Sequence, residues 1–309
     1  MKMIVFLASM TLPGACSHAQ TPATTIPMSD ARAKQEWESL TSFTEPKLKE
    51  ISGLAPSIST QSRLWSHNDS GGDAELHALD LDGTFLGSVA ILGVKNEDWE
   101  DLCAFQLGKQ SYLLIADTGD NARKRLSVQC HIVIEPKTNT TAIDVAWTQT
   151  IRYQDGPQDC ESVAVYEDKI FLLNKDKGIS VIYQAPLGGP KQLAAPVTAK
   201  KLAVLPHVNS AASSLTSVLK SGLLGTQATA LDISPDGQWA ASLTYTDMRL
   251  FKRQGKESWR TTFARSPKVI ALPDIYQPEA LCFSADGKSL LVSSEESPTP
   301  IVRYQLPTK

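Results

Sequence analysis

The residues with the clearest chemical potential in this sequence are three glutamates that open equivalent repeats. Glu100, Glu161 and Glu279 each stand directly before a short apolar segment. Carboxylates gathered in one partly buried cleft raise one another's pKa or are neutralised by a cation, and such clusters often mark functional sites. These three are therefore the candidates for acid, base or metal-binding roles. With Asp69 they form the predicted ligand set for Ca2+ or another divalent cation.

Further polar residues follow the second apolar segment of several repeats. A Gly-rich loop at 67–73 carries carboxylates and could offer oxygen ligands to a hard cation. A second loop, at 117–121, precedes three basic residues at 123–125. The predicted ligand-binding residues are His67, Asn68, Asp69, Asp117, Asp120, Asn121, Lys175, Tyr245 and Glu295.

Two functional hypotheses follow from these residues. The sequence contains no G-x-S-x-G elbow, no H-E-x-x-H pair and no Walker loop. The first hypothesis is a protein that binds a ligand or a protein partner at a polar, acidic site, with or without a divalent cation. The alternative is a metal- or carboxylate-dependent hydrolase of phosphoesters, esters or glycosides. Whether the chain is an enzyme stays open at this point.

An internal repeat must position these residues. Five segments share an apolar strand, a turn and a second apolar strand, and they begin at Ser52, Glu100, Glu161, Thr229 and Glu279. Two of them continue into near-identical Asp-Gly turns at 234–237 and 284–287, which are typical of hairpins. Four short antiparallel strands in each repeat of 48 to 68 residues predict the blade of a β-propeller.

The predicted fold is all-β, a single β-propeller of five four-stranded blades by direct count. Only 30 residues follow Glu279, enough for three strands, so the segment 44–49 is expected to supply the fourth strand and close the ring. The insertion at 200–225 is expected to be a lid over the site, or else a degenerate sixth blade. Neighbouring antiparallel strands reverse direction. The residues that open each repeat and those that end each second strand should therefore meet at one mouth of the central channel.

The N-terminus resembles an export signal. Lys2 precedes an apolar run at 4–12, which is too short to span a bilayer. The predicted signal peptide covers 1–19, with cleavage either before Cys16, which would then be lipidated, or before Gln20. A linker is expected at 20–43, with a short exposed helix at 30–40, and the propeller at 44–309. The expected location is the periplasm, or the outer membrane as a lipoprotein, with secretion as the alternative.

Composition narrows the choice of partner. The net charge of −3 and the pI near 6.0 argue against a nucleic-acid binder, which needs a basic face. We expect a monomer that meets a membrane only through an N-terminal lipid and binds a small molecule or an envelope protein. Cys103 and Cys282 occupy the same repeat position within apolar strands and are expected to be buried rather than bonded.

Several motifs resemble those of a known family. The segments Leu-Trp-Ser-His-Asn-Asp-Ser-Gly at 64–71, Asp-Trp-Glu-Asp at 98–101 and Asp-Thr-Gly-Asp-Asn at 117–121 carry the likeness, which spans 51–306. The chain resembles a family of bacterial secreted or lipoprotein β-propellers, distantly similar to TolB-like and phytase-like propellers. That resemblance implies an exported propeller, and it implies six blades rather than five. The Asp-Asp-Pro-Ala calcium motif of propeller phytases is absent from this sequence.

Overall fold

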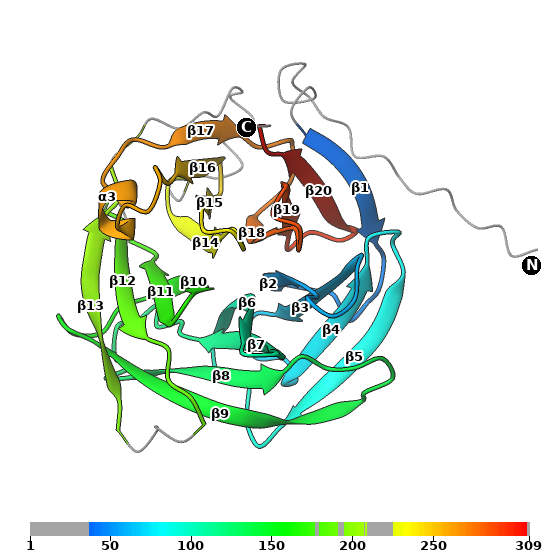
Figure 1. The fold of residues 1–309 in the computed structure, drawn as a ribbon. Helices are drawn as coiled ribbons and strands as arrows, with labels where there is room; N and C mark the ends of the chain where they lie inside the picture. Colours follow the sequence, from blue (N-terminus) through cyan, green and yellow to red (C-terminus); the bar gives the residue numbers. More distant parts are fainter. Residues whose placement is uncertain (1–36, 177–178, 191–194, 207, 209–224, 308–309) are drawn as a thin grey trace, which may run out of the picture.

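A computed structural model describes residues 37–176, 179–190, 195–206, 208 and 225–307. Within them the chain is all-β, with twenty strands and one short helix, α3 (Trp259–Phe263). The strands lie around a common centre, which makes the fold β-propeller-like (Figure 1). They form five groups of four: β2 (Ile51–Pro56), β3 (Arg63–Asn68), β4 (Glu75–Asp80) and β5 (Phe85–Leu92); β6 (Trp99–Leu107), β7 (Gln110–Asp117), β8 (Val128–Ile134) and β9 (Ala142–Tyr153); β10 (Cys160–Tyr166), β11 (Lys169–Asn174), β12 (Val181–Pro186) and β13 (Val197–Val204); β14 (Ala228–Ile233), β15 (Trp239–Thr244), β16 (Asp247–Lys252) and β17 (Lys268–Ala271); and β18 (Pro278–Phe283), β19 (Ser289–Ser294), β20 (Thr299–Gln305) and β1 (Trp37–Phe43).

The strand that completes the last group is not where the sequence predicted it. Residues 44–49 form a loop, and 37–43 form β1, which pairs antiparallel with β20. The predicted helix at 30–40 is therefore wrong from Trp37 onward; its earlier part, like the signal peptide and Cys16, lies outside the described residues. Trp37 packs against Tyr304 and donates from Nε1 to the Ala271 carbonyl at 2.8 Å. An arginine contact from β20, Arg303 to Glu38, adds to this pairing.

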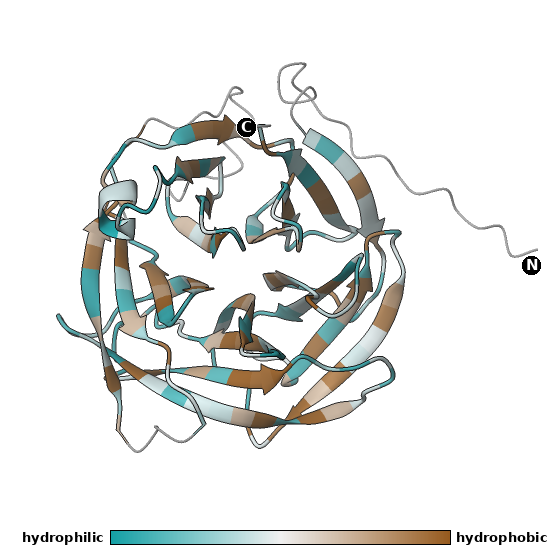
Figure 2. Ribbon diagram, viewed as in Figure 1, coloured by the Kyte–Doolittle hydropathy of each residue, from teal (hydrophilic) through white to brown (hydrophobic). Residues whose placement is uncertain are grey.

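Apolar clusters pack each group of strands against the next. Five clusters of buried side chains each draw on two groups, and one of them joins β18–β20 and β1 to β2–β4. Trp65 and Trp99 lie in the cluster between the first and second groups. Hydrophobic residues concentrate on the strands and hydrophilic ones on the loops (Figure 2). Each sheet thus buries both faces against its neighbours, which is the packing that a blade needs.

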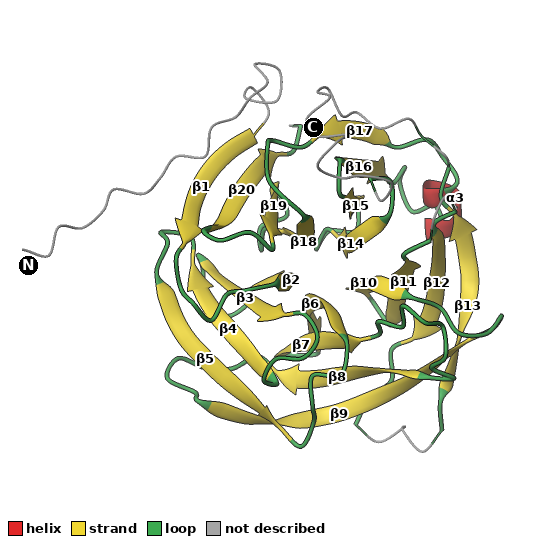
Figure 3. Ribbon diagram, turned by 180° about the vertical axis from the view of Figure 1, so that it is seen from behind, coloured by secondary structure: helices red, strands yellow, loops and turns green. Residues whose placement is uncertain are grey.

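The outer strands of three groups form a continuous belt. The long strand β9 pairs antiparallel with β8, and it also pairs parallel with β5 at one end and with β13 at the other. These pairings cover outer edges that would otherwise expose unpaired backbone groups. The short helix α3 lies beside β13 (Figure 3). No helix within the described residues has the length and apolar character to cross a membrane.

The predicted Asp-Gly turns adopt the same geometry in two groups. In each, the glycine, Gly237 or Gly287, has a positive φ and donates from its backbone N to the serine three residues earlier at 2.8 Å. That serine's hydroxyl bonds the intervening aspartate. These turns join β14 to β15 and β18 to β19, as expected from the sequence.

The insertion predicted at 200–225 is partly a strand. Residues 200–204 belong to β13, the outer strand of the third group. Residues 207 and 209–224 lie outside the described residues, and with them the predicted lid. The four cysteines of the described chain are buried and unbonded, as expected for Cys103 and Cys282.

Candidate functional site

A β-bulge occurs at the same place in the first strand of every group. Pairing between each first and second strand shifts register around one residue, and that residue is in each case the opening residue of the repeat. A bulge inserts one extra residue and re-aims its side chain. The five bulged residues are Ser52, Glu100, Glu161, Thr229 and Glu279. The same bulge thus occurs once in each of the five groups of strands.

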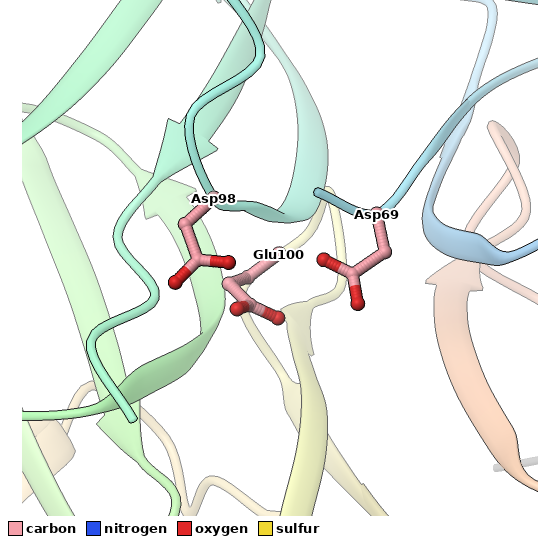
Figure 4. A group of neighbouring side chains, drawn as sticks. All are labelled: Asp69, Asp98 and Glu100. Atoms are coloured by element: carbon pink, nitrogen blue, oxygen red, sulfur yellow. The ribbon is translucent and has the colours of Figure 1, made fainter. Parts of the chain in front are cut away.

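Three carboxylates come together at the end of the channel where the first strands begin, which we call the channel mouth. One oxygen each from Asp69, Asp98 and Glu100 lie within 4.8 Å of one another. Asp69 follows β3, Asp98 precedes β6, and Glu100 is the bulged residue of β6. Their carboxyl groups face a common space (Figure 4). Glu100 is buried and the two aspartates are half-buried, so this acidic triad is partly shielded from water.

A glycine closes one side of the triad. A Cβ added at Gly119 would overlap Oε1 of Glu100 and Oδ2 of Asp98. The Gly119 backbone N donates to the Asp98 carbonyl at 3.2 Å, which keeps this loop against the carboxylates. Only glycine permits so close an approach of the backbone. Because Gly119 has no side chain, the loop at 117–121 can pack directly against the carboxylates of the triad.

The triad holds more negative charge than its surroundings neutralise. Burial, followed by the charges of Glu161 and Asp69, raises the pKa of Glu100 well above its usual value. Burial and the charge of Asp69 raise the pKa of Asp98 to about 6, although Arg125 opposes the shift. Carboxyl pKa values that stay raised although a cationic side chain lies nearby indicate a site that would gain from a bound cation.

Glu161 lies next to the triad and connects it to a lysine. Its carboxyl group lies close enough to that of Glu100 for its charge to raise the Glu100 pKa. Oε2 accepts from Lys175 Nζ at 2.8 Å, whereas the buried Oε1 has no hydrogen-bond donor. Burial raises the pKa of Glu161 to about 7 despite the opposing charge of Lys175. This carboxyl group therefore changes protonation near neutral pH.

The opposite side of the mouth carries a second set of paired polar groups. Tyr245 donates from its hydroxyl to Glu279 Oε1 at 2.6 Å, and the Lys175 ammonium lies 5.7 Å from the Tyr245 ring centre. Gln277 donates to Glu295 at 2.8 Å. Burial and the charge of Glu279 raise the pKa of Glu295 to about 8. Lys175 and Tyr245 thus supply the positive and the hydroxyl group of this side, and each is paired with a glutamate.

A half-buried arginine, Arg125, supports the loop that presses on the triad. Arg125 contacts Asp117 at 2.8 Å and donates to the Gly119 carbonyl at 2.9 Å. His131 approaches the other Asp117 oxygen at 3.7 Å. Burial by itself would raise the pKa of Asp117, but the nearby His131 and the charge of Arg125 outweigh it and lower the pKa. Asp117 is thus an anchor for the loop rather than a group facing the mouth.

Several predicted ligand-binding residues have structural partners instead. His67 is completely buried, packs edge-on against Trp99, and bonds the Asn68 carbonyl through Nδ1 at 3.0 Å. The Asn68 amide donates to the Lys47 carbonyl at 2.7 Å. Asp120 accepts from the backbone N atoms at 124 and 125 and so closes its own loop. Asn121 is exposed beyond that turn. Asn68 and Asp120 thus use polar atoms of their side chains in local contacts, whereas Nε2 of the buried His67 ring has no hydrogen-bond partner. That these residues meet a ligand stays a prediction.

The predicted metal set is also changed by the geometry. Within the described residues, Asp69 and Glu100 belong to the acidic triad, but Glu161 pairs with Lys175 and Glu279 with Tyr245. The third member is Asp98, which the prediction omitted. Because alternate residues of an extended chain share a face, its position two residues before Glu100 was the signal that could have revealed it.

Comparisons with known proteins identify no family. No protein-family model matches the chain, and no curated protein matches it. A PQQ-bound aldose sugar dehydrogenase from Streptomyces coelicolor is similar in structure, with a TM-score of 0.46 and 8% identity over 87% of this chain and 97% of that one. A protein described as a 6-phosphogluconolactonase from Bacteroides uniformis has a TM-score of 0.40 and 14% identity over 84% of this chain and 68% of that one. At these values neither likeness carries an argument about activity.

Proposed function

We propose that this chain is an exported β-propeller that binds a divalent cation at Asp69, Asp98 and Glu100. Through that cation it would bind a small molecule or an envelope protein partner at the channel mouth. The observation that carries the proposal is the convergence of three carboxylate oxygens within 4.8 Å around a buried Glu100. Oxygen-only ligands favour a hard cation such as Ca2+.

A second observation points to a missing cation at the same place. Oε1 of Glu161 is buried without a hydrogen-bond donor, and the charge of Glu161 is among the causes that raise the pKa of Glu100. Buried charges are normally paired or coordinate a metal. A cation in the triad would lower the pKa of Glu100 and relieve the repulsion between the two glutamates. Since Ca2+ takes about 6–8 oxygen ligands, three carboxylates would leave positions open for oxygens of a ligand.

The propeller of this proposal has five blades and a closed ring. Two features support closure. The first is the pairing of β1 with β20, which completes the last group with a strand from the other end of the described chain. The second is the apolar cluster that joins the last group to the first. A closed ring holds the mouth residues of different blades at fixed separations, as a binding site requires.

Export and anchoring are proposed from the sequence of the first 19 residues. We place the protein in the periplasm or, with Cys16 lipidated, at the outer membrane, where its partner would be an envelope component. Labelling with a radioactive fatty acid in a bacterial host tests this directly. Label that is lost in Cys16→Ser supports the anchor, and an unlabelled protein released by cleavage before Gln20 would replace it with simple secretion.

Cation binding is tested by isothermal titration of the chelator-treated protein with CaCl2, MgCl2 and MnCl2. We expect saturable binding of at least one cation at a single site, lost in Glu100→Gln and Asp98→Asn. Glu97→Gln is the matched control, because this exposed carboxylate lies one residue from Asp98 and outside the triad. Absence of binding in the unaltered protein, or equal binding in all variants, would reject the cation site.

One observation favours the alternative hydrolase function. Glu161 has a pKa raised to about 7 and touches Glu100, which suits a group that exchanges a proton near neutral pH. The hydrolase hypothesis requires turnover of a phosphoester, ester or glycoside that Glu161→Gln abolishes while cation binding persists. Turnover that is unchanged in Glu161→Gln, or absent, leaves the protein as a binding module.

A further inference from the structure

The end of the channel opposite the mouth holds a separate pocket. Its volume is about 420 Å3, within the range of about 300–1,000 Å3 typical of small-molecule sites. The pocket is lined by residues of all five innermost strands, β2, β6, β10, β14 and β18, and by the turns that follow some of them. None of its lining residues belongs to the acidic triad or to the pairs around Lys175 and Tyr245.

One lining residue differs in kind from its repeat equivalents. The fourth position of each repeat, counted from the bulged residue, holds Ala55, Cys103, Ala164, Asp232 and Cys282. Four of these side chains are small and uncharged. Their small size leaves room inside the ring of strands, and the fifth places a carboxylate against that space. Hydrophobic neighbours such as Leu54, Phe105 and Val165 make up much of the remaining wall.

The Asp232 carboxylate is held firmly but is not neutralised. Its two oxygens accept from the backbone N atoms of Ile233 and Phe283, each at 2.7 Å. No cationic side chain among the described residues forms an ion pair with it. Burial raises its pKa to about 7 in spite of the two hydrogen bonds. Asp232 nevertheless keeps part of its surface exposed, because it borders the pocket.

A second buried carboxylate shows what is particular to Asp232. Asp101 likewise accepts from two backbone N atoms, those of Leu102 and Val163, each at 2.8 Å. Asp101 has no exposed surface and does not line the pocket. Bracing two neighbouring inner strands therefore explains Asp101 fully. The same bracing role does not explain why the Asp232 carboxylate borders an open, largely apolar pocket.

We propose that this pocket binds a small organic ammonium ion, whose N–H groups donate to Asp232 while its hydrocarbon part lies against the apolar wall. Charge complementarity decides the class of ligand. An anion would be repelled by the Asp232 carboxylate and by the exposed Glu167 that also lines the pocket, and a neutral hydrocarbon would leave Asp232 unpaired. A bare metal ion lacks ligands here, because the thiols of Cys103 and Cys282 and the Asp232 carboxylate do not form a three-donor group.

Titration calorimetry with cyclohexylammonium, and with cyclohexanol as its neutral counterpart, tests this proposal. We expect the ammonium to bind and the alcohol to bind at least tenfold more weakly, since a hydrogen bond to a charged group carries that much affinity. Affinity for the ammonium should rise between pH 6 and pH 8 as Asp232 ionises.

Two variants decide whether Asp232 is the binding group. Asp232→Ala installs the residue that two equivalent positions already carry, so we expect it to fold, and Asp232→Asn keeps the shape while removing the charge. Both should weaken ammonium binding about tenfold or more and leave cyclohexanol unchanged. Ammonium binding that persists in both folded variants, or no ammonium binding in the unaltered protein, overturns the proposal.

The test is independent of the channel mouth. Glu100→Gln should abolish cation binding at the triad and leave cyclohexylammonium binding as it is. Loss of ammonium binding in Glu100→Gln would mean that the amine occupies the mouth instead of the far pocket, and this too would refute the proposal.

Discussion

Replacement of Glu100 by glutamine should change stability in opposite directions with and without a cation. In the cation-free protein at pH 8, Glu100 faces the charges of Glu161, Asp69 and Asp98 in a buried position. A glutamine has the same shape but cannot ionise, so it is not repelled by these three charges. Its amide can also donate to the unpartnered Oε1 of Glu161. The cation-free variant should therefore be more stable than the unaltered protein.

The size of both effects can be worked out from these contacts. Satisfying a buried polar atom contributes about 1–3 kcal/mol. For a large single domain that corresponds to about 2–12 °C in melting temperature. For the unaltered protein, Ca2+ at a hundredfold its Kd should add about 2.7 kcal/mol, or about 5–11 °C. The variant lacks one of three carboxylates in the triad, so this second gain should disappear.

Differential scanning calorimetry at pH 8 measures both effects in one experiment, with chelator and then with excess CaCl2. Glu97→Gln, which also removes one acidic charge near the mouth, should behave like the unaltered protein in both conditions. A Glu100→Gln variant that melts below the unaltered protein in chelator would show that Glu100 is a structural partner and not a repelled charge. A full calcium response in the variant would refute the triad as the cation site.

Three further predictions concern the surroundings of the triad. Gly119→Ala should weaken cation binding severely in calorimetric titration, because its Cβ would overlap the Glu100 and Asp98 carboxylates. Gly72→Ala should not, because its Cβ would meet nothing nearer than the Asp69 carbonyl oxygen at 3.9 Å, an ordinary contact. Arg125→Met should lower the free energy of unfolding in urea by about 3 kcal/mol, near the low end for a broken buried pair, because Arg125 is 18% exposed. The cation-free protein should lose about 3 kcal/mol of stability between pH 4.5 and pH 7 from Glu161, whose folded pKa is raised from 4.5 to about 7 by burial.

The sign of the pH effect follows from where the proton is bound. Below pH 4.5 Glu161 is protonated in both the folded and the unfolded chain, so its burial carries no charge penalty. As the pH rises toward 7 the unfolded chain loses this proton first, and folding becomes less favourable. Excess CaCl2 should flatten the decline. Stability that rises over this interval would contradict the raised pKa, and equal cation binding in the Gly119 and Gly72 variants would contradict the close approach.

Repetition made much of the fold predictable. The five opening residues, the Asp-Gly turns and the strands of each repeat could be found by aligning the chain with itself. β1 could not, because 37–43 has no strong alternation and its partner β20 lies about 260 residues away. The mixed charges of this segment favour an exposed helix when it is considered alone. Only the pairing of Trp37 with Tyr304, and the contacts beside it, determine that it is a strand.

The site was harder to predict than the fold, because equivalent positions do different work. Sequence equivalence placed Glu100, Glu161 and Glu279 together, but it could not show that two of them are already paired with Lys175 and Tyr245. Side-chain pairing depends on distances across blades that the repeat does not encode. The same limit applies to His67, whose sequence context resembles that of a ligand although its ring is buried.

The repeated bulge explains how one scaffold position serves both stability and binding. At two bulges the residue is a hydroxyl that holds the next blade: Ser52 donates to the Glu100 carbonyl, and Thr229 donates to the Pro278 carbonyl at 2.9 Å. Glu100 cannot donate as an ionised group, and the equivalent bond to the third group of strands comes instead from Thr118, which donates to the Cys160 carbonyl at 2.8 Å. Because a neighbour makes this contact, the carboxylate is free to face the channel. An acidic residue at a bulge is therefore better evidence of a ligand site when a neighbouring residue makes the hydrogen bond to the next group of strands. An acidic residue without that neighbour is weaker evidence.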